Sequence, residues 1–97
     1  MKIREAIEII NGSTSTVLAK ESNGFLHMYR RDIKVKSNWF LEMPIYATNW
    51  DYICSDWDYS SNIETQDLAR VMDVIQRLLD TPVKERFPEK KVSSAVD

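Results

Sequence analysis

The residues best suited to chemistry lie together in one stretch, residues 43–59. This stretch holds two tryptophans, three tyrosines and three aspartates, whereas the rest of the chain holds one tryptophan and one tyrosine. Within it, Thr48, Asn49 and Asp51 offer a hydroxyl, an amide and a carboxylate, the groups that hydrogen-bond ribose hydroxyls and an adenine edge. The alternative is structural, because the same residue types cap a turn before Tyr52. Both interpretations, a loop that binds a nucleotide and a capped turn, stay open at the level of these residues.

A basic cluster precedes this stretch and consists of Arg30, Arg31, Lys34 and Lys36. Such a run commonly forms a solvated strand edge that discourages pairing with other chains. Its functional alternative is that Arg30 and Arg31 hold a pyrophosphate through charge-assisted hydrogen bonds. Both interpretations stay open at the level of the sequence.

The other reactive residue types predict no catalysis. His27 alternates with positions expected to be buried, so we interpret it as a structural histidine with its hydrogen bonds satisfied. Cys54 is interpreted as a buried, inert thiol. The sequence has no paired acid and base, no Cys-His pair, no glycine-rich loop and no metal-ligand spacing. We therefore predict a protein that is not an enzyme and uses no metal or cofactor.

Composition narrows the classes of partner. The chain has 97 residues, a formal net charge of −2 and a pI near 5.4, which argues against binding to nucleic acid. Its single cysteine excludes an internal disulfide, as in a reducing cytoplasm. No apolar run approaches the roughly 20 residues that a membrane span needs, so no membrane contact is expected. A chain this short has a thin core, and association with a second subunit would stabilise it.

Hydrophobic periodicity and turn residues predict an α+β domain. The expected elements are a helix at 2–11 stopped by Gly12, strands at 16–19, 25–29 and 33–36, a hairpin turn at 22–24, a short apolar segment at 39–41, and a closing strand at 57–59. Residues 51–55 fit either one helical turn or an extended segment. Trp57 is expected to lie in the core.

A second helix gives the clearest pattern. Ser61 and Glu64 are expected to form a capping box that opens it, and Pro82 ends it because the residue before proline avoids the α region. Its apolar stripe consists of Leu68, Val71, Met72, Ile75, Leu78 and Leu79. This stripe exceeds what a thin sheet can cover, which makes a partner helix or second subunit a fair hypothesis. We predict one domain over residues 1–97, with a core at 1–80 and a tail at 81–97 whose end is disordered. Its fold is a small twisted antiparallel β-sheet with an N-terminal helix and a longer C-terminal amphipathic helix.

Several short motifs occur in the order and spacing of a known family. They are Glu5-Ala6-Ile7-Glu8, Val17, Asn23-Gly24, Pro44, Ala47-Thr48-Asn49, Asp51 and Asp56-Trp57. In this order the chain resembles the small phage proteins of the second Thoeris anti-defence family, over roughly residues 1–24 and 43–59. Two places differ, because Ala19 and Ser22 stand where the family usually has arginine and tryptophan. Trp50 or Tyr46 could supply the missing ring, since any aromatic face can stack on a base.

The resemblance implies a sponge that holds a cyclic ADP-ribose-type signal or a cyclic oligonucleotide without cleaving it. It also implies a homo-oligomer, a dimer or tetramer, with ligand sites between subunits, acting in the host bacterial cytoplasm. The ligand-binding residues would be Tyr46, Thr48, Asn49, Trp50, Asp51, Ser22 and Asn23, with Arg30 and Arg31 on the phosphates. The alternative is a phage protein that blocks a host or defence protein by surface contact, as anti-CRISPR-type inhibitors do.

Overall fold

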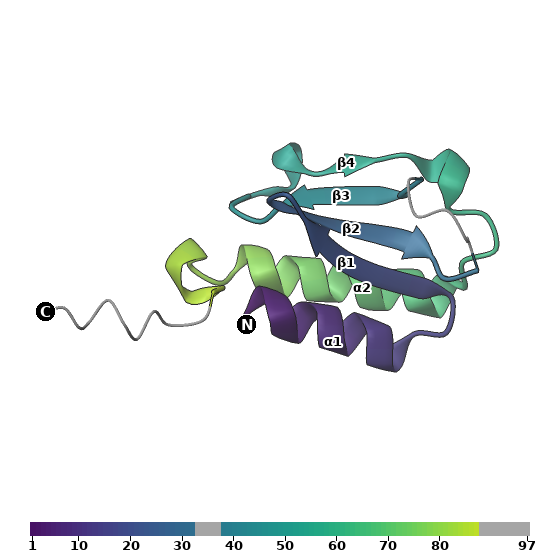
Figure 1. Cartoon of the computed structure of the whole chain (residues 1–97), viewed down its shortest axis with the longest axis horizontal. Helices are drawn as coiled ribbons and strands as arrows, with labels where there is room; N and C mark the ends of the chain where they lie inside the picture. The colour runs from purple at the N-terminus through teal and green to yellow at the C-terminus, as the bar shows by residue number, and fades with distance from the viewer. Residues whose placement is uncertain (33–37, 88–97) are drawn as a thin grey trace, which may run out of the picture.

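The computed structural model describes residues 1–32 and 38–87. It contains an N-terminal helix, a four-stranded antiparallel sheet and a C-terminal helix, which confirms the predicted α+β fold. Figure 1 shows both helices lying side by side against the same face of the sheet. The strand expected at 33–36 lies outside the described residues.

Nine elements form the fold. They are α1 (Ile3–Ser13), β1 (Val17–Ser22), β2 (Phe25–Arg30), β3 (Leu41–Pro44), η1 (Trp50–Tyr52), β4 (Cys54–Ser55), η2 (Trp57–Tyr59), α2 (Thr65–Leu79) and η3 (Val83–Glu85), where η marks a 3-10 helix, all within the described part of the chain. The strand order is β1-β2-β3-β4, and each neighbouring pair is antiparallel. The predicted hairpin turn is confirmed, with Asn23 at φ 54° and Gly24 at φ 87°, a region that these two residue types tolerate.

The core lies between the sheet and the two helices. Helical spacing turns Ile3, Ala6 and Ile10 of α1 inward, and strand alternation buries Leu26 and Met28 of β2. The fully buried residues of α2 are Val71, Val74, Ile75 and Leu78, of which the predicted stripe omitted Val74. Because α2 packs on α1 as well as on the sheet, the buried part of its stripe is covered within one chain.

One predicted boundary and one predicted element were wrong. Gly12 does not stop the first helix, which continues to Ser13 and ends where the backbone of Thr14 becomes extended, at φ −124° and ψ 151°. The backbone nitrogen and hydroxyl of Thr14 both donate to the Ile10 carbonyl, at 3.1 and 2.6 Å, which satisfies a carbonyl of the last turn. The closing strand at 57–59 is instead η2. There the Asp56 carboxylate accepts a hydrogen bond from the backbone nitrogen of Asp58 at 3.3 Å, which bends the chain into a turn.

The predicted capping box at Ser61 was also wrong, because α2 begins at Thr65 and its N-cap is Glu64. The cap comes from a distant loop. The hydroxyl of Thr16 accepts a hydrogen bond from the Glu64 nitrogen at 3.2 Å and donates to the Asp67 carboxylate at 2.5 Å. That carboxylate also accepts from the backbone nitrogens of Ser15 and Thr16 at 3.1 and 2.9 Å. This network fastens the α1–β1 loop to the first turn of α2.

The side chain of Asn11 covers the free edge of β1. Its amide nitrogen donates to the Ala19 carbonyl at 3.1 Å, and its amide oxygen accepts from the Ala19 nitrogen at 2.7 Å. It therefore occupies the place of a neighbouring strand, and Ala19 is 1% exposed. We expect Asn11→Ala to lower the free energy of unfolding by about 1–2 kcal/mol in urea titrations, because two backbone groups lose their partner. Asn38→Ala is the control, since Asn38 is exposed, and an equal loss in both variants would contradict the capping role.

The segment after α2 folds back on the body of the molecule. Arg86 is 1% exposed, and the ring of Phe87 lies 5.4 Å from that of Tyr46, centroid to centroid. Within the described residues, no helix is both long and apolar enough to cross a membrane.

Candidate functional site

An open depression of about 290 Å³ adjoins the loop that the sequence singled out. It is lined by Pro44, Tyr46, Ala47, Thr48 and Tyr52. The Tyr46 and Tyr52 residues are 64% and 58% exposed, so two aromatic rings are accessible beside an uncharged floor. Such a site offers stacking faces and a hydroxyl to a ligand, and it offers no acid-base pair.

The turn-capping interpretation of Asn49 is confirmed. Its side-chain oxygen accepts a hydrogen bond from the Asp51 nitrogen at 2.8 Å, which starts η1. Asp51 is exposed, and no described residue donates a hydrogen bond to its carboxylate. Trp50 is 39% exposed, but its indole nitrogen donates to the Gln76 side chain at 2.7 Å and so ties η1 to α2. Asp51 is therefore the more available of these groups for a ligand.

Ser22 and Asn23 lie at the same end of the sheet as the depression. They belong to the hairpin turn, and the Ile45 nitrogen donates to the Gly24 carbonyl at 3.0 Å, which joins this turn to the loop that carries Tyr46. Both Ser22 and Asn23 are exposed. The structure thus places seven of the predicted ligand residues at one end of the sheet.

Arg30 and Arg31 lie at the opposite end of β2 (Figure 1). Arg30 donates to the Asp32 carboxylate at 3.1 Å and to the Ser61 hydroxyl at 3.0 Å. Arg31 donates to the carbonyls of Asn11 and Thr14, at 3.0 and 3.4 Å. One copy of the chain therefore does not bring the predicted phosphate ligands to the predicted ring ligands.

The exposed tryptophans belong to a short repeat that sequence reasoning missed. Trp-Asp-Tyr occurs at 50–52 and again at 57–59, each time as a 3-10 helix started by the side chain of the preceding Asn49 or Asp56. The two turns flank β4. Trp57 was expected in the core, but it is 49% exposed and rests one side on Phe40, with ring centroids 6.3 Å apart. Cys54 was expected to be buried, but it is exposed because β4 is the last strand of the sheet.

His27 lies on the sheet face opposite the helices, between the rings of Phe25 and Trp39 at 6.0 and 5.9 Å. Its Nε2 lies 2.9 Å from a carboxylate oxygen of Glu42. Its Nδ1 is buried and has no hydrogen-bond partner among the described residues, so within this part of the chain the expectation of a fully satisfied histidine was wrong for this atom. Burial and the Glu42 charge raise the pKa of the neighbouring Tyr29. The aromatic packing indicates a structural role for His27.

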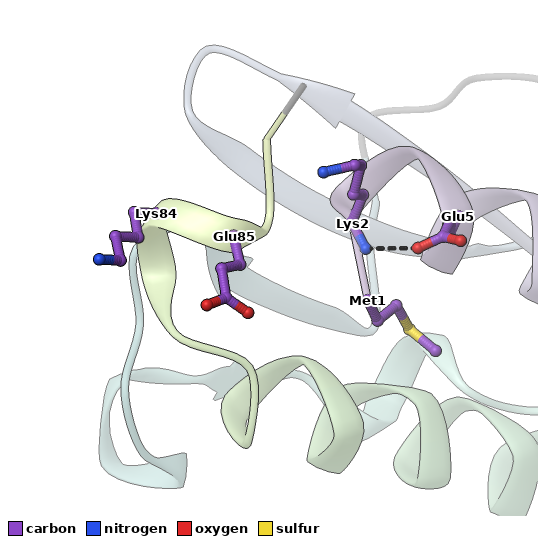
Figure 2. A pocket seen from close by; sticks show the side chains of 5 residues that line it. All are labelled: Met1, Lys2, Glu5, Lys84 and Glu85. Carbon is purple, nitrogen blue, oxygen red and sulfur yellow. Dashed lines mark hydrogen bonds between the residues drawn. The ribbon is translucent and has the colours of Figure 1, made fainter. Parts of the chain in front are cut away.

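A second pocket, of about 420 Å³, lies where α1 begins beside η3 (Figure 2). It is lined by Met1, Lys2, Glu5, Lys84 and Glu85. Several of its polar groups bond to other parts of the fold. The Glu5 carboxylate accepts a hydrogen bond from the backbone nitrogen of Lys2 at 2.7 Å. The Lys2 side-chain ammonium donates to the Phe87 carbonyl, and the Met1 ammonium donates to the Thr81 hydroxyl, both at 3.2 Å. In Figure 2 the ammonium of Lys84 points away from the other four side chains. The pocket thus carries both signs of charge and has no aromatic ring.

Among the described residues, no group of three or more histidine, cysteine, aspartate or glutamate side chains could hold a metal ion. Comparison with protein-family models, curated proteins and solved structures gives no match to this chain.

Proposed function

We propose that this chain is a phage-type anti-defence protein that captures a small cyclic nucleotide signal without cleaving it. The observation that carries the proposal is the depression of about 290 Å³ with Tyr46 and Tyr52 exposed at its rim. Stacking of one base on an aromatic ring contributes about 1–3 kcal/mol. Thr48 and the carboxylate of Asp51, to which no described residue donates a hydrogen bond, are the groups that would hold hydroxyls of the ligand.

The phosphates of such a ligand would need a separate source of positive charge, because the residues that line the depression carry none. In this proposal a second copy supplies it, with its Arg30 and Arg31 brought to the depression in a homo-oligomer. This is consistent with the ligand sites between subunits that the Thoeris resemblance implies. As a sponge, the protein acts by mass action and must therefore be abundant and bind tightly.

The test mixes the purified chain with the product of an activated TIR enzyme, removes unbound nucleotide, and denatures the protein by heat. Release of intact nucleotide supports sequestration, and release of a cleaved product would make the chain an enzyme. We expect Tyr46→Ala and Asp51→Asn each to weaken uptake about tenfold, which corresponds to about 1.4 kcal/mol. Asp73→Asn is the control because Asp73 lies on the exposed side of α2. If both variants take up as much nucleotide as the wild type, the binding site does not lie at this depression.

A second candidate function is that of an interaction protein that blocks a host or defence protein. The specific observation in its favour is that the exposed rings extend past the depression to Trp57, along β4. A run of accessible aromatic side chains is typical of surfaces that bind proteins. Absence of any nucleotide uptake would favour this candidate.

A further inference from the structure

The two edges of the sheet differ in a way that points to a binding surface. At β1 the Asn11 side chain occupies the free backbone groups of Ala19. At β4 no described element pairs with the outer side of the strand. The Asp56 nitrogen donates to the Phe40 carbonyl, so the alternation of an antiparallel ladder turns the N–H and C=O of Ser55 away from β3.

Aromatic rings stand at both ends of this open edge. Trp50 and Tyr52 precede β4, and Trp57 follows it, at 39%, 58% and 49% exposure. The two tryptophan rings are held in place, since the Trp50 indole nitrogen donates to Gln76 and the Trp57 ring packs on Phe40. We define the β4 edge as Trp50, Tyr52, Ser55 and Trp57 with the carboxylates of Asp51 and Asp58.

The acidic residues near the β4 edge indicate the chemistry of its partner. Residues 38–63 contain four acidic residues and no lysine, arginine or histidine. Asp51 and Asp58 are exposed, and no described residue donates to their carboxylates. Arg30 reaches Ser61 near one end of this segment, but it is itself paired with Asp32. The β4 edge is therefore aromatic and acidic, which suits lysine and arginine side chains through ion pairs and cation–π contacts.

The same charges disfavour a second copy of the chain as the occupant. Because the N–H and C=O of Ser55 point outward, antiparallel pairing of two β4 strands would set Ser55 of one copy opposite Ser55 of the other. This would bring the Asp51 and Asp58 carboxylates of both copies to one interface, where like charges repel. A basic segment meets no such repulsion.

We propose that the β4 edge binds an extended, lysine- or arginine-containing segment of a partner protein, which adds to the sheet beside β4. This inference rests on the second candidate function, interaction with a protein, and names the chemistry of the partner. The peptide backbone bonds to Ser55, and its basic side chains lie against the tryptophan rings and reach the two aspartates. Because β4 has only two residues, the rings and charges must supply most of the affinity.

The test uses the full chain and a fluorescent ten-residue peptide that alternates lysine or arginine with threonine and valine. Two further peptides are matched to it: one carries glutamate in place of each basic residue, and one is N-methylated on every second backbone nitrogen. Fluorescence anisotropy should show binding of the basic peptide that weakens with salt. We expect the glutamate and N-methylated peptides to bind at least about tenfold more weakly. Equal binding of all three peptides, or no binding of the basic one, would overturn the proposal.

Variants locate the site on the protein. We expect Asp58→Lys to raise the Kd of the basic peptide about tenfold, and Ser55→Pro to do the same by removing the outward N–H. Glu21→Lys makes the same change of net charge at an exposed residue of β1 and should leave the Kd of the basic peptide unchanged. If Ser55→Pro fails to fold, the N-methylated peptide still tests the backbone contact.

Light scattering separates the remaining outcomes. If the chain is a dimer and the Ser55 amide is protected from hydrogen exchange, a second copy pairs with the β4 edge. That result would overturn the proposal. Nucleotide uptake is measured independently, so a chain that takes up nucleotide and ignores the basic peptide supports sequestration and rejects the peptide site. A chain that does the opposite rejects sequestration and keeps the peptide site.

Discussion

Replacing Arg86 with methionine is expected to lower the free energy of unfolding by about 3 kcal/mol. Arg86 is 1% exposed, and its guanidinium donates to the carbonyls of Thr81 and Ile45, both at 3.0 Å. No carboxylate of the described chain pairs with it, so burial alone lowers its pKa. Methionine keeps most of the volume and leaves both carbonyls without their donor. For a domain of this size the loss corresponds to a fall in Tm of roughly 15 °C.

The control is Arg77→Met, the same change at an exposed position on α2, which should shift the free energy of unfolding by no more than about 0.5 kcal/mol. Calorimetry and urea unfolding measure both variants. Burying a charge is itself costly, and apolar replacements of buried ions are neutral or stabilising in some proteins. If Arg86→Met were as stable as Arg77→Met, the cost of desolvating the guanidinium would outweigh its two hydrogen bonds. Arg86 would then not be what holds the C-terminal segment to the loop at Ile45.

The parts of the fold that local sequence determines were predictable. The hairpin follows from Asn23 and Gly24, which reach positive φ with little strain, and α2 follows from the spacing of its apolar residues. The turn at Trp50 is one of the two alternatives that the sequence leaves open there, whereas the turn at Trp57 was missed. The reason is physical. A side-chain oxygen at Asn49 or Asp56 competes for backbone N–H groups and folds a Trp-Asp-Tyr segment that strand propensity alone would extend.

Features that depend on distant parts of the chain were not predictable. The cap of α2 comes from Thr16, which is 48 positions before Glu64, so no local motif could reveal it. Arg86 looks like an ordinary charged tail residue until the segment folds back on Ile45. In both cases the partner is a side chain or carbonyl that tertiary packing alone brings near.

The candidate site was predictable in part. Tyr46 and Thr48 line the depression and are exposed, and Asp51 is exposed close to them in the same loop, as a binding loop requires. The separation of the arginines could have been inferred from the strand itself. A strand rises about 3.3 Å per residue, so the two ends of β2 lie roughly 17 Å apart. Arg30 is the last residue of β2 and therefore lies at the end away from the hairpin turn.

We expect Asp67→Ala to lower the free energy of unfolding by about 3 kcal/mol at neutral pH, the second large effect. The residue is 3% exposed, and one carboxylate oxygen accepts from the Thr16 hydroxyl and from the nitrogens of Thr16 and Ser15. The hydrogen bond from the Thr16 hydroxyl is the largest cause of its lowered pKa; the two backbone bonds and the Arg31 charge add to it, and burial opposes it. Removal leaves these donors unpaired and weakens the cap of α2.

The lowered pKa of Asp67 also fixes the direction of the pH dependence. A carboxyl group whose pKa is lower in the folded state than the usual value of about 3.9 stabilises the fold above that value. This contribution is lost as the pH falls through the folded pKa. In urea titrations, the advantage of the wild type over Asp67→Asn should therefore be full at pH 7 and shrink below about pH 4. Asp73→Asn on exposed α2 should show no such change. A gap between wild type and Asp67→Asn that stayed constant down to about pH 2 would mean that the Asp67 charge is not what stabilises this network.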